Sequence, residues 1–329
     1  MFIAPFKAWV MIFRVQAVMV WAILTVSVST AWAGLEGVSI NWVNMLLTAA
    51  IASITQGFPA HIVNEIYDWK SGTDKAFASG KISGGSKVLQ TGLIDVAGLW
   101  RMFAVTSFFD LLLVCILYYR TQSLTLVLIF GIGYLVCVFY TLPPLSLAYR
   151  PFAGEWLGGF TGVGLNMTGS YYVQTGQFSA SMVSFAVVLG MLYVSIMILF
   201  HYIDHDNDAA AVPRKTTTIV FLGLDQSRIY NLTVAGAAAV LSALLAWRFG
   251  RIFLVMTTAL IFHWFFQYRC DPFDTRSVVA NGKKITLVVL VFGVVFSVLS
   301  DVNFLFLIPV FVAGFVLHRK FGKVPRVTT

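Results

Sequence analysis

The chain has 329 residues, of which 59% are hydrophobic and only 11% are charged, and its mean hydropathy is +0.85. These values exclude an ordinary soluble domain and predict a protein solvated by lipid. The net charge of +8 is scattered between apolar segments and forms no basic domain, which argues against a nucleic-acid partner. Cys115, Cys137 and Cys270 have no metal-ligand spacing, so neither zinc nor disulfides are expected.

The first apolar run could be read in two ways. Lys7 and Arg14 precede an apolar stretch that ends in Ala31-Trp32-Ala33, which resembles a cleavable signal peptide. The run over 15–33 is long for a signal peptide and suits a transmembrane helix. We therefore expect it to remain in the protein as the first membrane span.

Apolar segments of helical length recur along the whole chain, whereas the short alternating strands of a membrane barrel do not. Eight spans are expected, over 9–33, 40–62, 96–119, 122–142, 155–175, 180–203, 228–247 and 250–268. The apolar segment 285–318 adds one or two crossings. The sequence thus predicts an all-α, polytopic membrane bundle of nine or ten helices, folded as a single domain over residues 1–329.

Basic residues fix the expected orientation, because cytoplasmic loops are enriched in Lys and Arg. They follow the even-numbered spans, as in Lys70, Lys75, Lys81 and Lys87, Arg150, Arg214, Lys215 and Arg228, and Arg269, Arg276, Lys283 and Lys284. Only Arg120, Arg248 and Arg251 fall on the other side. This pattern predicts a cytoplasmic N-terminus and a multi-pass protein of the cell membrane. The basic C-terminal tail favours ten crossings or a re-entrant pair over nine.

Two acidic clusters border spans on the expected cytoplasmic side, in loops 63–95 and 203–228. The first contains Asn64 and Asp68, which share one helix face, and Asp74 after a break expected at Gly72. The second contains Asp204 and Asp208, again four residues apart. An acidic run is usually a solvated surface, but the repeated spacing at two span ends on one face indicates a site.

Carboxylates this dense repel one another unless a cation lies between them. Magnesium prefers oxygen ligands and is commonly held by one or two carboxylates together with substrate phosphates. The clusters therefore predict a magnesium–diphosphate site. Basic residues from the same loops could bind the remaining phosphate oxygens; the candidates are Lys70, Lys75, Lys87, Arg214 and Lys215. For His61 and His201, interfacial packing is favoured over a ligand role.

At these residues the sequence resembles the UbiA superfamily of intramembrane prenyltransferases, and most of all its 1,4-dihydroxy-2-naphthoate polyprenyltransferase branch. Asn64 to Lys75 has that branch's NxxxDxxxGxDK spacing, and the stretch Gly84 to Leu89 is similar to its GGSRVL segment. Residues 140–144 resemble its YTxPP turn, with Tyr149-Arg150 following, and residues 171–176 resemble its TYYVQTG segment.

The second acidic motif departs from that branch. Where the family has DxxxDxxxGKRT, Asp208 is followed by a segment about two residues longer that lacks the glycine and reaches Arg214-Lys215. Val220 to Gly223 restores the family pattern. Because this segment differs, the role of Lys215 and the identity of the acceptor do not follow directly from the motif.

The resemblance implies a magnesium-dependent enzyme that transfers a polyprenyl group from its diphosphate to an aromatic acceptor, in naphthoate-derived menaquinone synthesis. It implies two Mg²⁺ ions, one held by Asp68 and Asp74 with Asn64 nearby, and one held by Asp204 and Asp208. Substrate-binding roles are expected for Asn64, Lys70, Lys87, Tyr140, Arg150, Tyr172, Arg214 and Lys215. The site would open sideways into the lipid bilayer to admit the polyprenyl tail.

Two alternatives stay open. The same diphosphate chemistry could serve another acceptor, such as a glycerol-phosphate lipid, a tetrapyrrole, or the isoprenoid's own double bonds in a cyclase. A cation-coupled transporter would instead place its carboxylates near the bilayer midplane, whereas these lie at span ends. One further pattern is structural: Gly154, Gly158 and Gly162 at four-residue spacing predict close helix packing.

Overall fold

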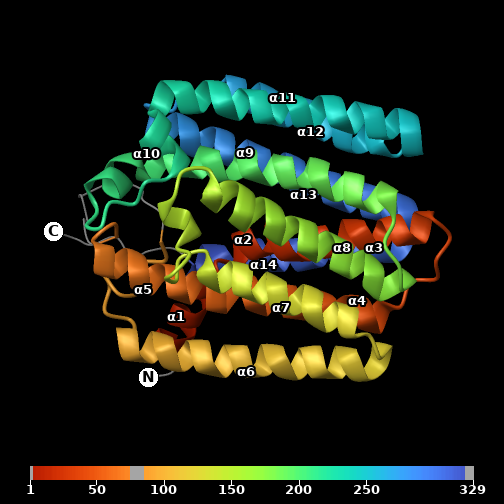
Figure 1. Ribbon diagram of the computed structural model, residues 1–329, viewed down its shortest axis with the longest axis horizontal. Coiled ribbons are helices and arrows are strands. Elements are labelled where there is room, and N and C mark those ends of the chain that lie inside the picture. The colour runs from red at the N-terminus through yellow and green to blue at the C-terminus, as the bar shows by residue number, and fades with distance from the viewer. Residues whose placement is uncertain (1–2, 75–84, 323–329) are drawn as a thin grey trace.

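The computed structural model describes residues 3–74 and 85–322, and all regular secondary structure within these ranges is helical (Figure 1). Most helices run nearly parallel or antiparallel along the long axis of the molecule. Lipid offers backbone groups no hydrogen bonds, so helices satisfy them internally. The expectation of an all-α membrane bundle is therefore confirmed.

The first half of the chain forms ten helical elements in the described residues. Their bounds are α1 (Ile3–Phe13), α2 (Val15–Val18), η1 (Met19–Ile23), α3 (Leu24–Leu35), α4 (Trp42–Thr55), η2 (Gln56–Ala60), α5 (His61–Ser71), α6 (Val96–Thr121), α7 (Leu124–Phe139) and η3 (Leu147–Tyr149). The second half continues with η4 (Gly154–Phe160), α8 (Thr161–Thr175), α9 (Ala180–Ala210), α10 (Thr218–Leu222), α11 (Leu224–Phe249), α12 (Phe253–Tyr268), α13 (Thr275–Ser300), η5 (Val302–Phe306) and α14 (Leu307–Phe321).

Seven helical segments among the described residues are long and apolar enough to cross a membrane. They are Val15–Leu35, Trp42–Ser71, Val96–Thr121, Ala180–Ala210, Leu224–Phe249, Thr275–Ser300 and Val302–Phe321, and two shorter apolar helices are Leu124–Phe139 and Phe253–Tyr268. This count does not support the predicted figure of nine or ten. The segment expected over 285–318 is divided between two of these helices, because Asp301 ends α13 and caps η5 by accepting from the backbone N–H of Asn303 at 2.8 Å.

Three helical segments contain π-helical turns: two within spans Val15–Leu35 and Trp42–Ser71, and one at the start of the segment that continues as α8. η1, η2 and η4 are π-helical, and η2 contains Pro59, whose missing N–H cannot serve a regular α-helix. At Arg14 the chain adopts a left-handed conformation, φ 47°, which separates α1 from α2. π-Helical turns are frequent at functional sites, and these three all border one cavity described below.

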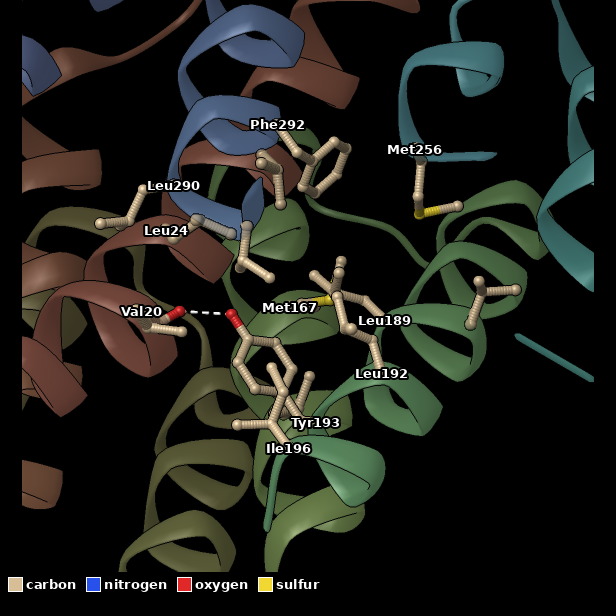
Figure 2. Close-up of a cluster of buried hydrophobic side chains, with 14 of the residues drawn as sticks. Val20, Leu24, Met167, Leu189, Leu192, Tyr193, Ile196, Met256, Leu290 and Phe292 are labelled. Carbon is tan, nitrogen blue, oxygen red and sulfur yellow. Dashed lines mark hydrogen bonds between the residues drawn. The ribbon is translucent and has the colours of Figure 1, made fainter. Parts of the chain in front are cut away.

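The largest hydrophobic core joins α3, α8, α9, α12 and α13. Figure 2 shows its centre, where Met167, Leu189, Leu192 and Phe292 meet, and where the hydroxyl of buried Tyr193 donates to the backbone carbonyl of Val20. That carbonyl lies within π-helical η1, where the hydrogen-bond pattern departs from that of a regular α-helix. The core therefore fixes the first span against α9.

The glycines at four-residue spacing serve different purposes. A Cβ at Gly158 would lie 2.6 Å from the ring of Tyr140, and one at Gly154 would lie 3.3 Å from the Cα of Ala148. These two permit the close packing that the sequence predicts. A Cβ at Gly162 would meet nothing within 4 Å, so packing does not explain this residue.

Both acidic clusters lie at one end of the bundle, where α5 and α10 are found (left in Figure 1). α5 ends at Gly72, whose φ is 86°, a conformation that glycine adopts without strain. The expected break is thus observed. α9 continues to Ala210, seven residues beyond the span end expected at 203, so Asp204 and Asp208 lie on its last two turns.

Candidate active site

A cavity of about 690 Å³ runs from this end of the bundle into the membrane-embedded interior. Its mouth is polar, and its deeper walls are largely apolar, with Val20, Ile51, Ile129 and Val163 among the lining residues. The polar residues that line the mouth are Arg14, His61, Asn64, Asp68, Thr73, Asp74, Ser86, His201, Asp204, Asp208 and Lys215. The cavity combines a charged mouth with a lipid-like interior.

Asp68 is the centre of the mouth. It is 4% exposed and accepts hydrogen bonds from Asn64 Nδ2 at 2.9 Å, from the Tyr149 hydroxyl at 2.9 Å and from Lys215 Nζ at 2.8 Å. Asn64 also donates to Thr141 Oγ1 at 3.3 Å. The one-face spacing of Asn64 and Asp68 thus produces a direct contact, and residues remote in sequence complete it.

Asp74 reaches the mouth from beyond the Gly72 turn. Its Oδ1 accepts from Lys87 Nζ at 3.2 Å, and its buried Oδ2 has no hydrogen-bond partner in the described part of the chain. A Cβ at Gly85 would lie 2.4 Å from this Oδ2, and Gly85 has φ 84°. Only glycine lets the segment that begins at residue 85 approach the carboxylate so closely.

Asp208 approaches from α9 on the opposite side. It is 1% exposed, its Oδ1 lies 3.7 Å from Lys215 Nζ, and neither of its oxygens has a hydrogen-bond partner among residues 3–74 and 85–322. Asp204, one turn earlier, also lines the cavity. A single ammonium group, that of Lys215, therefore lies between the carboxylates of the two clusters.

The mouth has unusual electrostatics outside the membrane-spanning helices. Burial raises the pKa of Asp74 to about 7, although the ammonium of Lys87 opposes this shift. Burial alone would lower the pKa of Lys215, but the carboxylates of Asp208 and Asp68 raise it well above its ordinary value. The mouth thus combines buried carboxylates with the ammonium groups of Lys87 and Lys215.

The donor set suits a cation that shares its coordination with a bound ligand. No group of three His, Cys, Asp or Glu side chains in the described ranges forms a complete protein metal site. The buried oxygens of Asp74 and Asp208 that lack partners are hard donors, which suit Mg²⁺. Mg²⁺ needs only one or two carboxylates when phosphate oxygens complete its shell, so these residues fit the ion.

Several residues expected at the site lie elsewhere. Lys70 is exposed and lies 5.4 Å over the Tyr67 ring, Arg150 is exposed and donates to the Pro144 carbonyl at 3.0 Å, and Arg214 is exposed. Tyr172 lies near the far end of α8, with its ring 4.9 Å from that of Phe178. Lys75 and Lys81 lie outside the described residues. By contrast, Lys87 contacts Asp74, and Tyr140 lines the cavity.

The structure also adds polar residues that spacing alone did not reveal. Arg14 lines the cavity and donates to buried Glu65 at 3.3 Å, and Glu65 accepts from the Ser86 N–H at 2.8 Å. A basic residue inside an apolar run was the available signal. His201 lies 3.3 Å from Glu155, which also accepts from Thr218 at 2.7 Å, so His201 belongs to a polar network and not to simple interfacial packing.

The amino-acid sequence matches a known protein family. A model of the UbiA prenyltransferase family matches residues 19–280, which is most of the chain. The chain belongs to this family. No curated protein sequence gives a match. The family match agrees with the resemblance seen in the acidic motifs, and it makes the protein a prenyltransferase-family enzyme with many apolar membrane helices.

Solved structures support the UbiA fold. A UbiA homolog from Archaeoglobus fulgidus, solved with DMAPP and Mg²⁺, is similar with a TM-score of 0.67 at 13% identity, over 88% of this chain and 98% of that chain. A UbiA homolog from Aeropyrum pernix K1 gives 0.62 at 15% identity, over 83% and 97%. A structure of digeranylgeranylglyceryl phosphate synthase gives 0.59 at 13% identity, over 90% and 98%.

Proposed function

We propose that this UbiA-family protein transfers a polyprenyl group from a prenyl diphosphate to an aromatic acceptor, with 1,4-dihydroxy-2-naphthoate as that acceptor. The observation that carries the proposal is the cavity mouth. Two helix ends place Asp68 and Asp208 on either side of Lys215, above an apolar chamber inside the bundle. The charged mouth suits a diphosphate head group, and the apolar chamber suits an isoprenoid tail.

Two magnesium ions would be held at this mouth. Asp68 and Asp74, with Asn64 beside them, would hold one ion, and Asp204 and Asp208 would hold the other. When bound, Mg²⁺ would neutralise the departing diphosphate, so that the allylic carbon–oxygen bond breaks with carbocation character. The A. fulgidus homolog with DMAPP and Mg²⁺ supports this choice of ion and substrate class.

Lysines at the mouth would bind the phosphate oxygens. Lys215 has three donors and contacts two carboxylates, at 2.8 Å and 3.7 Å, and Lys87 contacts Asp74 at 3.2 Å. Both ammonium groups thus lie beside the carboxylates at which the metal–diphosphate would bind. The Tyr149 hydroxyl donates to Asp68 and lies 3.0 Å from Ser71 Oγ, and these contacts fix the orientation of the Asp68 carboxylate.

The chamber below the mouth would hold the isoprenoid and keep water from the reacting carbon. Trp21, Phe130, Tyr140 and Phe200 line it with aromatic surface. Water is the nucleophile that would otherwise trap a carbocation, so an apolar wall protects the transfer to the acceptor. Tyr140, packed on Gly158 between mouth and chamber, would lie beside the allylic carbon.

The naphthoate acceptor is supported by the motif resemblance, above all the spacing of Asn64, Asp68 and Asp74 and the turn that begins at Tyr140. A second candidate keeps the diphosphate and changes the acceptor to a glycerol-phosphate lipid. The structural similarity to digeranylgeranylglyceryl phosphate synthase favours it, as does the altered segment between Asp208 and Lys215. A transporter is disfavoured because the carboxylates lie at helix ends.

The membrane arrangement is part of the proposal. Counting the two shorter apolar helices and the combined η4–α8 segment with the seven long ones gives ten crossings. Ten crossings place both chain ends on one side, as the basic tail requires, and the distribution of Lys and Arg makes that side cytoplasmic. The active site would then open to the cytoplasm of a plasma-membrane protein.

Purified protein tests the function directly. We expect magnesium-dependent transfer of radiolabelled geranylgeranyl diphosphate to dihydroxynaphthoate, lost with EDTA and in Asp68→Ala and Asp204→Ala. Transfer to glycerol phosphate but not to naphthoate would move the assignment to the second candidate. A protein that neither binds nor consumes any prenyl diphosphate would refute both.

A further inference from the structure

Four glycines line the membrane-embedded wall of the cavity, and two of them have a packing role. A Cβ at Gly158 would lie 2.6 Å from Tyr140, and one at Gly159 would lie 2.2 Å from the sulfur of Met197. A side chain at either position would require Tyr140 or Met197 to move. Close approach therefore explains why these two are glycine.

Gly133 on α7 and Gly162 on α8 have no such role. A Cβ at either position would meet nothing within 4 Å, and neither glycine has a positive φ. Glycine inside a helix is about 0.5–1 kcal/mol less favourable than alanine, and here no packing contact offsets this. What the two positions share is that both face the cavity.

We propose that Gly133 and Gly162 keep the tail passage open and thereby determine how long an isoprenoid the enzyme accepts. The inference rests on the proposed function. The mouth of the same cavity supports a ligand there independently, because Asp208 is 1% exposed, lines the cavity and leaves both carboxylate oxygens without hydrogen-bond partners in the described residues.

The depth of Gly133 and Gly162 below the mouth determines which isoprenoid tails are long enough to reach them. Asn64 donates to Thr141, so the neighbouring Tyr140 lies at the level of the mouth. Gly133 is seven residues before Tyr140, about 10 Å deeper, and Gly162 is four residues beyond Gly158, about 6 Å deeper. An extended isoprenyl unit adds about four carbon–carbon bonds of about 1.5 Å, or roughly 5 Å of length.

A dimethylallyl tail therefore ends near the mouth, a geranyl tail reaches the two glycines, and a geranylgeranyl tail passes them. Beyond them the lining includes Ile51 and Ile129, and Asn166, whose amide donates to Thr25. A leucine side chain is nearly the size of one isoprenyl unit. At either glycine it would occupy the passage and displace buried CH₂ groups of the tail, each worth about 0.8 kcal/mol.

The helices supply matched controls. Gly164 lies two residues from Gly162 on α8, and Gly131 lies two residues from Gly133 on α7. A Cβ at either control position also meets nothing within 4 Å, but neither residue lines the cavity. Leucine there adds the same bulk to the same helix on its other side.

The test measures magnesium-dependent binding of dimethylallyl, geranyl and geranylgeranyl diphosphate to detergent-purified protein, which requires no acceptor. For Gly162→Leu and Gly133→Leu, we expect geranylgeranyl diphosphate to bind about tenfold or more weakly, while dimethylallyl diphosphate stays within about twofold of wild type. Gly164→Leu and Gly131→Leu should bind all three as wild type does.

An unchanged preference in Gly162→Leu and Gly133→Leu, or an equal change in the controls, would overturn the inference while leaving the proposed function intact. Wild-type protein that binds no prenyl diphosphate would overturn both. If one cavity variant does not elute as a monodisperse species in gel filtration, the other variant and its own control decide the question.

Discussion

Replacing Lys215 with methionine tests whether the acidic clusters form one cation site. The ammonium contacts Asp68 at 2.8 Å and Asp208 at 3.7 Å, and all three residues are at most 7% exposed. Removing one partner from a buried ion pair typically destabilises a protein by about 3–5 kcal/mol, because the remaining charge stays buried and unpaired. In EDTA, Lys215→Met should therefore unfold about 6–10 °C below wild type, at about 2 °C per kcal/mol.

Magnesium should restore much of this loss, because the ion would supply the charge that the lysine no longer provides. The assay is thermal unfolding in detergent, with EDTA and with saturating Mg²⁺. Arg214→Met is the control, since this neighbouring cation is exposed and should change the unfolding temperature little in either condition. A Lys215→Met protein as stable as wild type in EDTA, or one that Mg²⁺ stabilises no more than wild type, would refute the reasoning.

Three further expectations concern single groups at the mouth or away from it. Tyr149→Phe removes a charge-assisted hydrogen bond of 2.9 Å to Asp68. The substitution should lower kcat/KM about tenfold and weaken the apparent binding of Mg²⁺ in a titration. If both quantities stay unchanged, Tyr149 does not position Asp68. Burial raises the pKa of Asp74 to about 7, so below pH 7 the metal-free carboxyl is mostly protonated, and Mg²⁺ must displace this proton in order to bind. Calorimetry should therefore give weaker Mg²⁺ binding at pH 6 than at pH 8. Asp74→Asn should reduce this difference. Tyr172→Phe should keep activity within about twofold of wild type, because its ring packs on Phe178 and does not line the cavity; a large loss in a transfer assay would return Tyr172 to the site.

Local features of the site were predictable from sequence because they follow from helix geometry. The four-residue spacing of Asn64 and Asp68 gives their 2.9 Å contact, and Gly72 ends α5 where a glycine break was expected. The first acidic motif could therefore be read in detail. The second was harder, because α9 continues past the apolar stretch to Ala210 and carries Asp204 and Asp208 on the helix itself.

Contacts between residues far apart in the chain could not be predicted from the local spacing of residues. Tyr149 and Asp68 are 81 residues apart, and Lys215 and Asp68 are 147 apart, so no periodicity connects them. Lys215 nevertheless reaches Asp68 although the segment before it is longer than in the resembling branch. Conversely, Tyr172 follows a shared motif but lies at the far end of α8, since a motif match carries no information about depth in the bilayer.

The number of crossings illustrates a different limit. Hydropathy finds apolar length, yet α7 and α12 are shorter than a usual span, and α8 reaches the length of a span only together with π-helical η4. Gly162 also shows that a sequence pattern does not determine which residues pack together. Its four-residue spacing from Gly158 predicts packing, and only the three-dimensional arrangement shows that nothing packs there.

The central claim is that both acidic clusters together bind a magnesium–diphosphate complex. The most direct measurement is equilibrium binding of radiolabelled geranylgeranyl diphosphate to wild type, Asp68→Asn and Asp208→Asn, each with Mg²⁺ and with EDTA. The account predicts tight binding only for wild type with Mg²⁺, and a loss of about a hundredfold in each variant. Binding that persists in EDTA, or that only one of the two substitutions weakens, would contradict it.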